Sequence, residues 1–293
     1  MAAMNIPVVS QVLAVLAAAG MLWLFALSVG YTAALSMAAA SLAFSAMSVI
    51  VAARRLYFLA GASPHSALLA ATIAIPLAYS VGGDPYLYAV PLSVLLVYIA
   101  GYIIYRGVDP DIATSILVAL SASGSVTAVY YVKTAFPVSY DVSAIVFGDP
   151  LLVTKRETYM AVATAVLALA LTLLTYVENV YLGVDRDSAR ITGLRVWLYD
   201  LLFFTLLGVV VAVMVKVVGF ILEHVFMLLP GAAASVSAGS ARRALLLSLV
   251  LSFTAMGLGA GLSLATGLSP SGASGFAMLG LYVVAVLAGR GRQ

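Results

Sequence analysis

The chain has 293 residues, of which 64% are hydrophobic and only 9% are charged, and its mean hydropathy is +1.16. A soluble globular protein is nearer half apolar and a quarter charged, so this composition excludes an ordinary soluble domain. The formal net charge is only +3, and the absence of cysteine excludes thiolate metal ligands and disulfides. The positions of the few charges are therefore more informative than their sum.

Apolar segments of about 20 residues, long enough to cross a bilayer as helices, recur along the chain. They lack the alternation of a transmembrane β-barrel. The predicted spans are 8–29, 32–53, 65–82, 86–105, 112–132, 158–183, 196–217, 219–236, 242–266 and 271–289. The segment 219–236 is the weakest, because Gly219, Pro230 and Gly231 can break it into a re-entrant half-helix. The sequence thus predicts an all-α polytopic membrane protein of eight to ten spans, in a single domain over residues 1–293.

The basic residues predict how the chain is oriented. With a cytoplasmic N-terminus, ten of them fall in inside loops and four outside, as the positive-inside rule expects. The inside set is Arg54, Arg55, Arg106, Arg186, Arg190, Arg195, Arg242, Arg243, Arg290 and Arg292. The outside set is Lys133, Lys155, Arg156 and Lys216. We therefore expect a multi-pass protein of the cytoplasmic membrane with both termini inside, and a long outside loop at about 133–157.

Motifs for catalysis are missing from the sequence. It contains no G-x-x-x-x-G-K-[ST], no H-E-x-x-H and no G-x-S-x-G. We therefore expect no catalytic residues and no P-loop nucleotide site in this chain. Nothing in the sequence indicates nucleic acid as a partner; the surroundings expected for its apolar surface are membrane lipid.

A short polar segment, residues 184–195, separates two long apolar ones. Asp185 can cap the start of a short helix and Asp187 falls in its first turn. Ala189 allows close packing, and Gly193 suits the residue after a helix end. On these residues alone, the segment is either an ordinary amphipathic loop or a helix that receives a partner protein.

The segment resembles the cytoplasmic loop of the ABC permease family that imports zinc, manganese or iron. That loop reads F-D-P-E-x-A-x-A-L-G and follows an acidic residue by about seven positions. Glu178, Asp185, Ala189 and Gly193 fall in this register, while Val184, Arg186 and Asp187 replace Phe, Pro and Glu. Four more segments resemble the family in the right order, so that the likeness covers most of residues 40–289. They are 54–59 followed by His65, 148–153, 218–234 and 270–273.

The resemblance implies the fold and partners of an ABC importer permease of the metal or cobalamin-uptake type. Two copies would form a homodimer around one path. A cytoplasmic ABC ATPase would engage the helix at 184–195, and an extracytoplasmic metal-binding protein would deliver substrate to the outside loop. The residues implied in ATPase coupling are Glu178, Asp185, Asp187, Ala189, Arg190 and Gly193.

The resemblance also implies a transport subunit, not an enzyme, because the separate partner hydrolyses ATP. The chain would bind no cofactor of its own, and its substrate would be a divalent metal ion. Two alternatives stay open: a permease for metal chelates such as siderophores, haem or cobalamin, and, further from the pattern, an intramembrane enzyme.

Three ionisable residues are candidates for the substrate pathway and for metal ligation: His65, Glu223 and His224. In the resembled family an Asp four residues before the His is implied to join it on the metal, but this chain has Gly61 there. An ionisable pair such as Glu223 and His224 is costly in an apolar segment and is therefore a functional candidate. Adjacent helical residues point about 100° apart, so these two converge only if the helix is broken there or a neighbouring residue helps.

Other interpretations of these residues stay open. Glu223 and His224 could be solvated at the outer membrane face, or Glu223 could pair with Lys216. His65 could make a polar contact at the start of its span, directly after Pro64.

Two further features concern packing. Asp200, near the cytoplasmic end of its span, is expected to pair with an arginine. The small residues Gly257, Gly259 and Gly261 are expected to allow close helix packing, either within one chain or between two copies.

Overall fold

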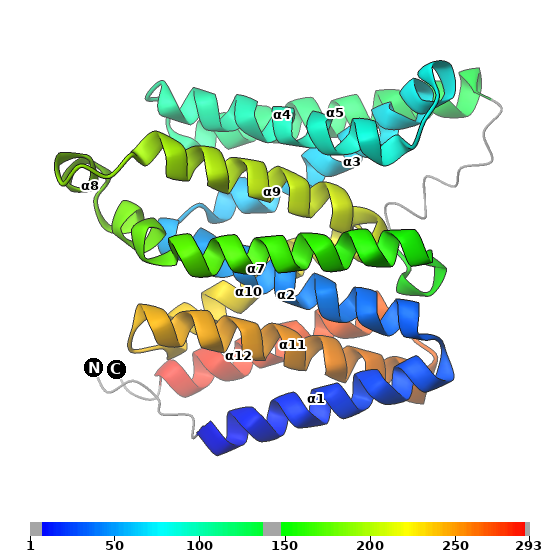
Figure 1. Cartoon of the computed structure of the whole chain (residues 1–293), viewed down its shortest axis with the longest axis vertical. Helices are drawn as coiled ribbons and strands as arrows, with labels where there is room; N and C mark the ends of the chain where they lie inside the picture. The colour runs from blue at the N-terminus through cyan, green and yellow to red at the C-terminus, as the bar shows by residue number, and fades with distance from the viewer. Residues whose placement is uncertain (1–7, 137–147, 291–293) are drawn as a thin grey trace.

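The computed structural model of the chain describes residues 8–136 and 148–290, and its regular elements in these ranges are all helical (Figure 1). Ten helices of the described ranges are long and apolar enough to cross a membrane. They are α1 (Val8–Ser28), α2 (Tyr31–Arg54), α3 (Tyr57–Val81), α4 (Pro85–Tyr105), α5 (Pro110–Ala135), α7 (Lys155–Val184), α9 (Val196–Val218), α10 (Phe220–Ser237), α11 (Ala241–Thr266) and α12 (Pro270–Arg290). The prediction of an all-α polytopic membrane protein is confirmed, with the largest of the expected span counts.

Successive spans run in opposite directions, so their ends form two faces of the bundle (Figure 1). One face, called here the α8 end, holds the short helix α8 (Arg186–Ile191), the start of α1 and the end of α12. The opposite end holds the 3-10 turn η1 (Pro150–Leu152) and the α9–α10 junction. The two candidate functional regions, described below, are α8 itself and the facing surfaces of α3 and α10.

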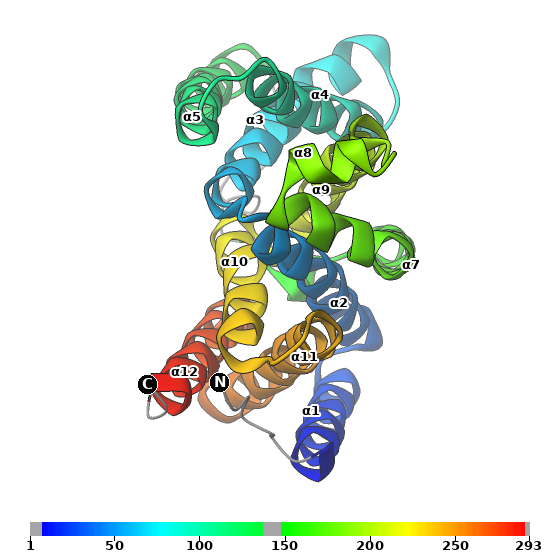
Figure 2. The same ribbon diagram turned by 90° about the vertical axis from the view of Figure 1, so that its left-hand side faces the viewer.

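Helix α2 lies at the centre of the bundle, packed against α7, α10 and α11 (Figure 2). In its most apolar stretch 83% of the residues are buried, compared with 17% for the peripheral α1. The reason is its composition, because its many Ala and Ser side chains let neighbouring helices approach closely. Helix α2 is thus the element through which distant parts of the chain touch.

Hydrogen bonds to small residues fix two neighbours to α2. The backbone N–H of Gly231 on α10 donates to Ser48 Oγ at 2.8 Å, and Ser252 Oγ on α11 donates to the carbonyl of Ser41 at 2.8 Å. A Cβ atom placed on Gly231 would lie 2.1 Å from the carbonyl oxygen of Ser48. The contact between α10 and α2 therefore requires glycine at position 231.

Helix α3 begins at Tyr57, eight residues earlier than the predicted span at 65–82. Pro64 lies inside the helix and has no N–H to give to the carbonyl of Ala60. Ser63 Oγ donates to that carbonyl at 2.8 Å instead, which satisfies the acceptor left without a partner. His65 is consequently in the third turn of α3, and the interpretation of His65 as a contact at the start of a span is wrong.

Helix α10 is continuous, so the predicted possibility of a re-entrant half-helix is also wrong. The break falls before it, at Gly219, whose φ of +85° favours glycine and turns the chain between α9 and α10. Pro230 and Gly231 are both accommodated within the helix.

Helix α7 begins at Lys155, within the predicted outside loop at 133–157. Thr154 and Glu157 form a capping box: Thr154 Oγ1 accepts from the backbone N–H of Glu157, and Glu157 Oε2 accepts from that of Thr154 at 2.8 Å. Helix α5 extends to Ala135 at the other side of the loop. Residues 137–147 of the predicted loop lie outside the described ranges.

Ion pairs at the end opposite α8 correct one prediction. Lys216 pairs with Glu157 of α7 rather than with Glu223, and Arg156 pairs with Asp84 before α4. The span of Lys216, α9, ends at Gly219, and Glu223 lies on the far side of this turn. The position of Glu157 in the first turn of α7 places its carboxylate nearer to Lys216.

The small-residue surface of α11 packs within this chain. A Cβ atom on Gly257 would lie 2.5 Å from the Cα of Ala18 on α1, and one on Gly259 would lie 2.4 Å from the Cα of Ser274 on α12. Of the two predicted uses, packing inside one copy is therefore the one that the structure shows at these positions.

Candidate functional site

His65 and His224 face each other from α3 and α10. Their ring centroids lie 5.4 Å apart with the ring planes nearly perpendicular. Phe220 precedes His224 by one helical turn, and its ring packs against His65 at 4.8 Å and against His224 at 4.6 Å. Both imidazoles are half-buried, and the helices that carry them, α3 and α10, lie next to each other (Figure 2).

The ring of His224 is held in place by backbone carbonyls. Nδ1 lies 2.8 Å from the carbonyl oxygen of Phe220, and the ring also interacts with the backbone of Gly61 on α3. A carbonyl can only accept, so in this bond Nδ1 carries the proton.

Glu223 is separated from the two histidines. It is fully buried, and neither carboxylate oxygen has a hydrogen-bond partner among the described residues. On the unbroken helix it shares a side with Met227 and Gly231, which face the bundle interior and α2. The interpretation of Glu223 as a solvated residue is therefore wrong.

The predicted trio thus divides into a facing pair and a buried acid. Within residues 8–136 and 148–290 no group of three or more His, Asp or Glu side chains is close enough to hold a metal ion. Whether His65, His224 and Glu223 contact substrate stays a prediction. In this conformation only the two imidazoles are placed to act together.

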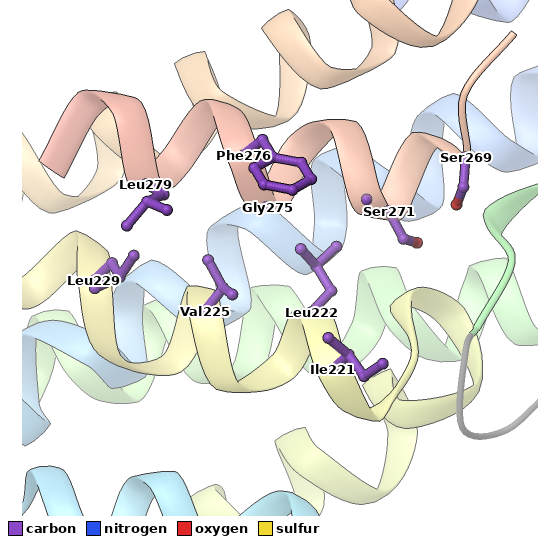
Figure 3. Close-up of a pocket in the computed structure, with 10 residues that line it drawn as sticks. Ile221, Leu222, Val225, Leu229, Ser269, Ser271, Gly275, Phe276 and Leu279 are labelled. Atoms are coloured by element: carbon purple, nitrogen blue, oxygen red, sulfur yellow. The ribbon is translucent and has the colours of Figure 1, made fainter. Parts of the chain in front are cut away.

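An apolar cleft lies on another side of α10, between α10 and α12 (Figure 3). It has a volume of about 550 Å³, and no titratable side chain lines it. Leu222, Val225 and Leu229 border it from α10, and Phe276 and Leu279 border it from α12. With no donor group besides serine hydroxyls, this cleft is unsuited to binding a bare metal ion.

Helix α8 is defined by its two caps. Asp185 accepts from the backbone N–H groups of Asp187 at 3.0 Å and Ser188 at 3.2 Å, as the sequence predicts. Hydrogen bonds from the Ser188 hydroxyl and from these two N–H groups lower the pKa of the Asp185 carboxyl. At the other end Gly193 has φ +87°, and the N–H of Leu194 donates to the carbonyl of Ala189 at 3.1 Å, a Schellman motif.

One face of α8 is anchored and the other is exposed. Ala189 is buried against Leu182 and Val196, while Asp187 and Arg190 are exposed. Ile191 is 86% exposed, which is unusual for an apolar side chain at the end of a membrane bundle rather than in the lipid zone. Our reading of the sequence missed Ile191, although an isoleucine among charged residues was the available signal.

Glu178 belongs to α7 rather than to the exposed surface of α8. It is half-buried, and its carboxylate interacts by a hydrogen bond with the hydroxyl of Tyr199 on α9. Of the six residues predicted for ATPase coupling, Glu178 and Ala189 therefore support α8 from behind. Asp185, Asp187, Arg190 and Gly193 are exposed.

The prediction that Asp200 pairs with an arginine is confirmed, and the residue pairs with two of them. One carboxylate oxygen accepts from Arg54 at the end of α2, and the other accepts from Arg186 of α8 at 2.5 Å. The Arg54 guanidinium also lies over the ring of Phe203, 4.9 Å from its centroid. The pairing of Arg186 with Asp200 is not indicated by the sequence pattern.

The fold and these sites define a polytopic helical membrane protein that presents a short capped helix at one end. The chain belongs to the ABC 3 transport family, whose model matches residues 26–289. The family places it among transport proteins and not among enzymes.

Two curated relatives are similar to this chain over most of its length. A probable metal transport system membrane protein of Treponema pallidum (strain Nichols) is 24% identical over 211 residues, covering 70% of this chain and 75% of the relative. A protein of the same description from Thermotoga maritima is 27% identical over 188 residues, covering 63% of each chain.

Two solved structures share the fold. PsaBC from Streptococcus pneumoniae in complex with Fab matches with a TM-score of 0.74 and 21% identity, over 87% of this chain and 90% of that one. An inward-facing ABC transporter described as of metal-chelate type matches with a TM-score of 0.65 and 14% identity, over 94% and 99%. At these identities the likeness shows the fold alone.

Proposed function

We propose that this chain is the membrane permease subunit of an ABC importer that moves divalent metal ions (zinc, manganese or iron) across the cytoplasmic membrane. Membership of the ABC 3 transport family supports the permease role, and the names of the two curated relatives support the substrate class. The observation that carries the substrate class in this chain is the facing pair His65 and His224.

The chemistry of this pair fits a transition-metal cation. Neutral imidazole nitrogen is a good ligand for zinc and iron, and bound zinc typically lies about 2.0–2.1 Å from it. Two imidazoles at the observed spacing can approach one ion together. The metal in this proposal is the cargo, and the chain holds no cofactor of its own.

The partners follow from the two ends of the bundle. A cytoplasmic ABC ATPase would bind the exposed face of α8, with Asp187, Arg190 and Ile191 in contact. An extracytoplasmic binding protein would deliver the metal to the end that holds η1. This assignment makes the α8 end cytoplasmic, in agreement with the distribution of basic residues.

A second copy of the chain would complete the path. His65 and His224 are only half-buried in one copy. In a homodimer with α3 and α10 at the interface, the two pairs would face one path between the copies. The path would then be lined by four imidazoles.

ATP-dependent uptake tests this function and separates it from the chelate alternative. The chain is reconstituted in liposomes with its ATPase and binding protein, and uptake of zinc, manganese, iron(II) and an iron–siderophore complex is measured. We expect uptake of at least one bare cation, and none when the ATPase carries an inactivating substitution. Uptake of the chelate alone would contradict the proposal and support the metal-chelate type instead.

A further inference from the structure

Three structural elements meet at the carboxylate of Asp200. The residue belongs to the first turns of α9, and it accepts from Arg54 of α2 on one oxygen and from Arg186 of α8 on the other. The side chain of Arg54 is only 3% exposed, whereas that of Arg186 is 37% exposed. One buried carboxylate therefore joins the surface helix α8 to the central helix α2.

The rest of the attachment of α8 involves other elements. Ala189 packs on Leu182 of α7 and Val196 of α9. Behind it, α7 touches the end of α2 so closely that a Cβ atom on Gly183 would lie 1.8 Å from the carbonyl oxygen of Ala53. The two ion pairs of Asp200 link a side chain of α8 to α2 by way of α9.

Helix α2 in turn holds the helix that carries His224. The N–H of Gly231 on α10 donates to Ser48 Oγ at 2.8 Å, in a contact with no room for a side chain at position 231. Ser252 attaches α11 to the same helix through the carbonyl of Ser41. A displacement of α2 along or about its axis would be passed to both neighbours, since packed interiors do not deform freely.

We propose that Asp200 is a positioning residue that couples α8 to α2, so that movement of α8 imposed by the ATPase reaches α10 and the opposite end of the bundle. This inference rests on the proposed function only in that a partner must move α8. Separating the partners of a buried ion pair is strongly unfavourable, because it leaves an uncompensated buried charge. The Arg54–Asp200 pair therefore keeps α2 and α9 joined while α8 moves. Arg186, which is half-exposed, is the partner of Asp200 that has room to move.

The variant that tests the link is Arg186→Gln. It removes the ion pair between α8 and Asp200 and leaves the buried Arg54–Asp200 pair intact, so folding is preserved. Arg156→Gln is the matched control, because it breaks an ion pair with Asp84 at the opposite end, where Arg156 is 63% exposed. Mutations along a coupling network change the coupling between two sites by about 2- to 30-fold. We expect Arg186→Gln to weaken the coupling between α8 and α2 by a factor in this range.

The readout is movement, independent of what is transported. The chain has no native cysteine, so Leu268→Cys places one spin label per copy in the exposed loop between α11 and α12. The distance between the labels of the two copies is measured by pulsed electron resonance with ATPase bound, with and without ATP. ATPase association and ATP hydrolysis are measured in the same samples.

We expect ATP to change the distance distribution in the otherwise unaltered chain and in Arg156→Gln. In Arg186→Gln the ATPase still binds and hydrolyses ATP, but the change is reduced or lost. An unchanged response in Arg186→Gln, an equal loss in Arg156→Gln, or no response in the unaltered chain would overturn the inference. An ATP-dependent change without uptake of any metal would contradict the proposed cargo and leave the coupling role of Asp200 intact.

Discussion

The imidazole rings of His65 on α3 and His224 on α10 lie 5.4 Å apart, although 159 positions separate them in the chain. The ring of His224 also interacts with the backbone of Gly61, one turn before His65. The result is a pair of imidazoles at a place where the resembled family is implied to combine one histidine with one aspartate.

The first prediction concerns metal preference and the variant Gly61→Asp. Nitrogen ligands favour zinc and iron(II), whereas manganese is better served by carboxylates. A Cβ atom at position 61 meets only Leu228 Cδ1, at 3.6 Å, so the first atom of a side chain there causes no clash. We expect Gly61→Asp to raise the ratio of manganese to zinc uptake by about tenfold, since added carboxylates suit the harder ion.

The control for this change is Gly61→Asn, which adds a similar volume without charge. Competitive uptake of the two metals from one solution gives the ratio directly. An equal shift with Asn would show that the effect comes from displacing His224 rather than from the new carboxylate.

The second prediction concerns Glu223. A charged carboxylate in an apolar interior without a partner is very costly, so we expect the side chain to be a neutral acid. Glu223→Gln keeps its shape and should change the free energy of unfolding by less than about 1 kcal/mol. Glu223→Lys, which forces a charge into the same place, should prevent stable folding.

Thermal unfolding in detergent and metal uptake together test this account of Glu223. Glu223→Gln should retain most of the uptake. If this variant folds normally but transports no metal, the Glu223 carboxylate must contact the substrate in another conformation. Its separation from His65 and His224 in this structure would then not hold during transport.

The third prediction concerns the contact between α10 and α2. In Gly231→Ala the new methyl group would lie 2.1 Å from the carbonyl oxygen of Ser48, so the helices must separate. Overpacking of this kind costs about 1–3 kcal/mol, measurable as a lower unfolding midpoint. Gly280→Ala on α12 is the control, because nothing lies within 4 Å of its added Cβ, and it should be neutral or slightly stabilising.

The fourth prediction concerns the pH dependence of α8. The pKa of Asp185 is lower in the folded chain than in the unfolded one, because hydrogen bonds from Ser188 and Asp187 favour the carboxylate. The cap therefore stabilises α8 fully above the ordinary aspartate pKa of about 3.9 and is lost as the pH falls through the lower, folded value.

Hydrogen exchange of the Ser188 amide follows this cap. Exchange there should be slow at neutral pH and accelerate, relative to amides of the spans, only below about pH 4. Asp185→Asn should keep the cap and abolish the pH dependence, whereas Asp185→Ala should fray α8 and weaken ATPase association. Unchanged exchange in Asp185→Ala would mean that Ala189 alone holds the helix.

Much of the fold could be predicted because the membrane imposes it. Long apolar stretches must form helices where no water can satisfy the backbone, so the approximate positions of the spans follow from hydropathy. The caps of α8 were also predictable, since Asp185 and Gly193 act on their own neighbours. The start of α7 could also be predicted, because T-x-x-E at Thr154 to Glu157 is a capping-box pattern.

Other features depend on contacts between distant segments. Nothing local indicates that Lys216 pairs with Glu157 rather than Glu223, or that Glu223 faces α2. The start of α3 was misplaced because Ser63 compensates for Pro64, an effect of one side chain that hydropathy does not register. The meeting of His65 with His224 likewise requires the packing of α3 on α10.

The rate of ATP-dependent zinc uptake in His65→Ala and His224→Ala, with ATP hydrolysis measured in the same liposomes, tests the central claim most directly. Loss of one imidazole should lower uptake by about 10- to 100-fold or more. Losing even a residue that only hydrogen-bonds a metal ligand typically costs that much in affinity or activity. ATPase association should be unchanged, and Phe220→Leu, which alters the packing but removes no ligand, should cost less. Normal zinc uptake in both alanine variants would contradict the claim that this histidine pair lies on the metal pathway.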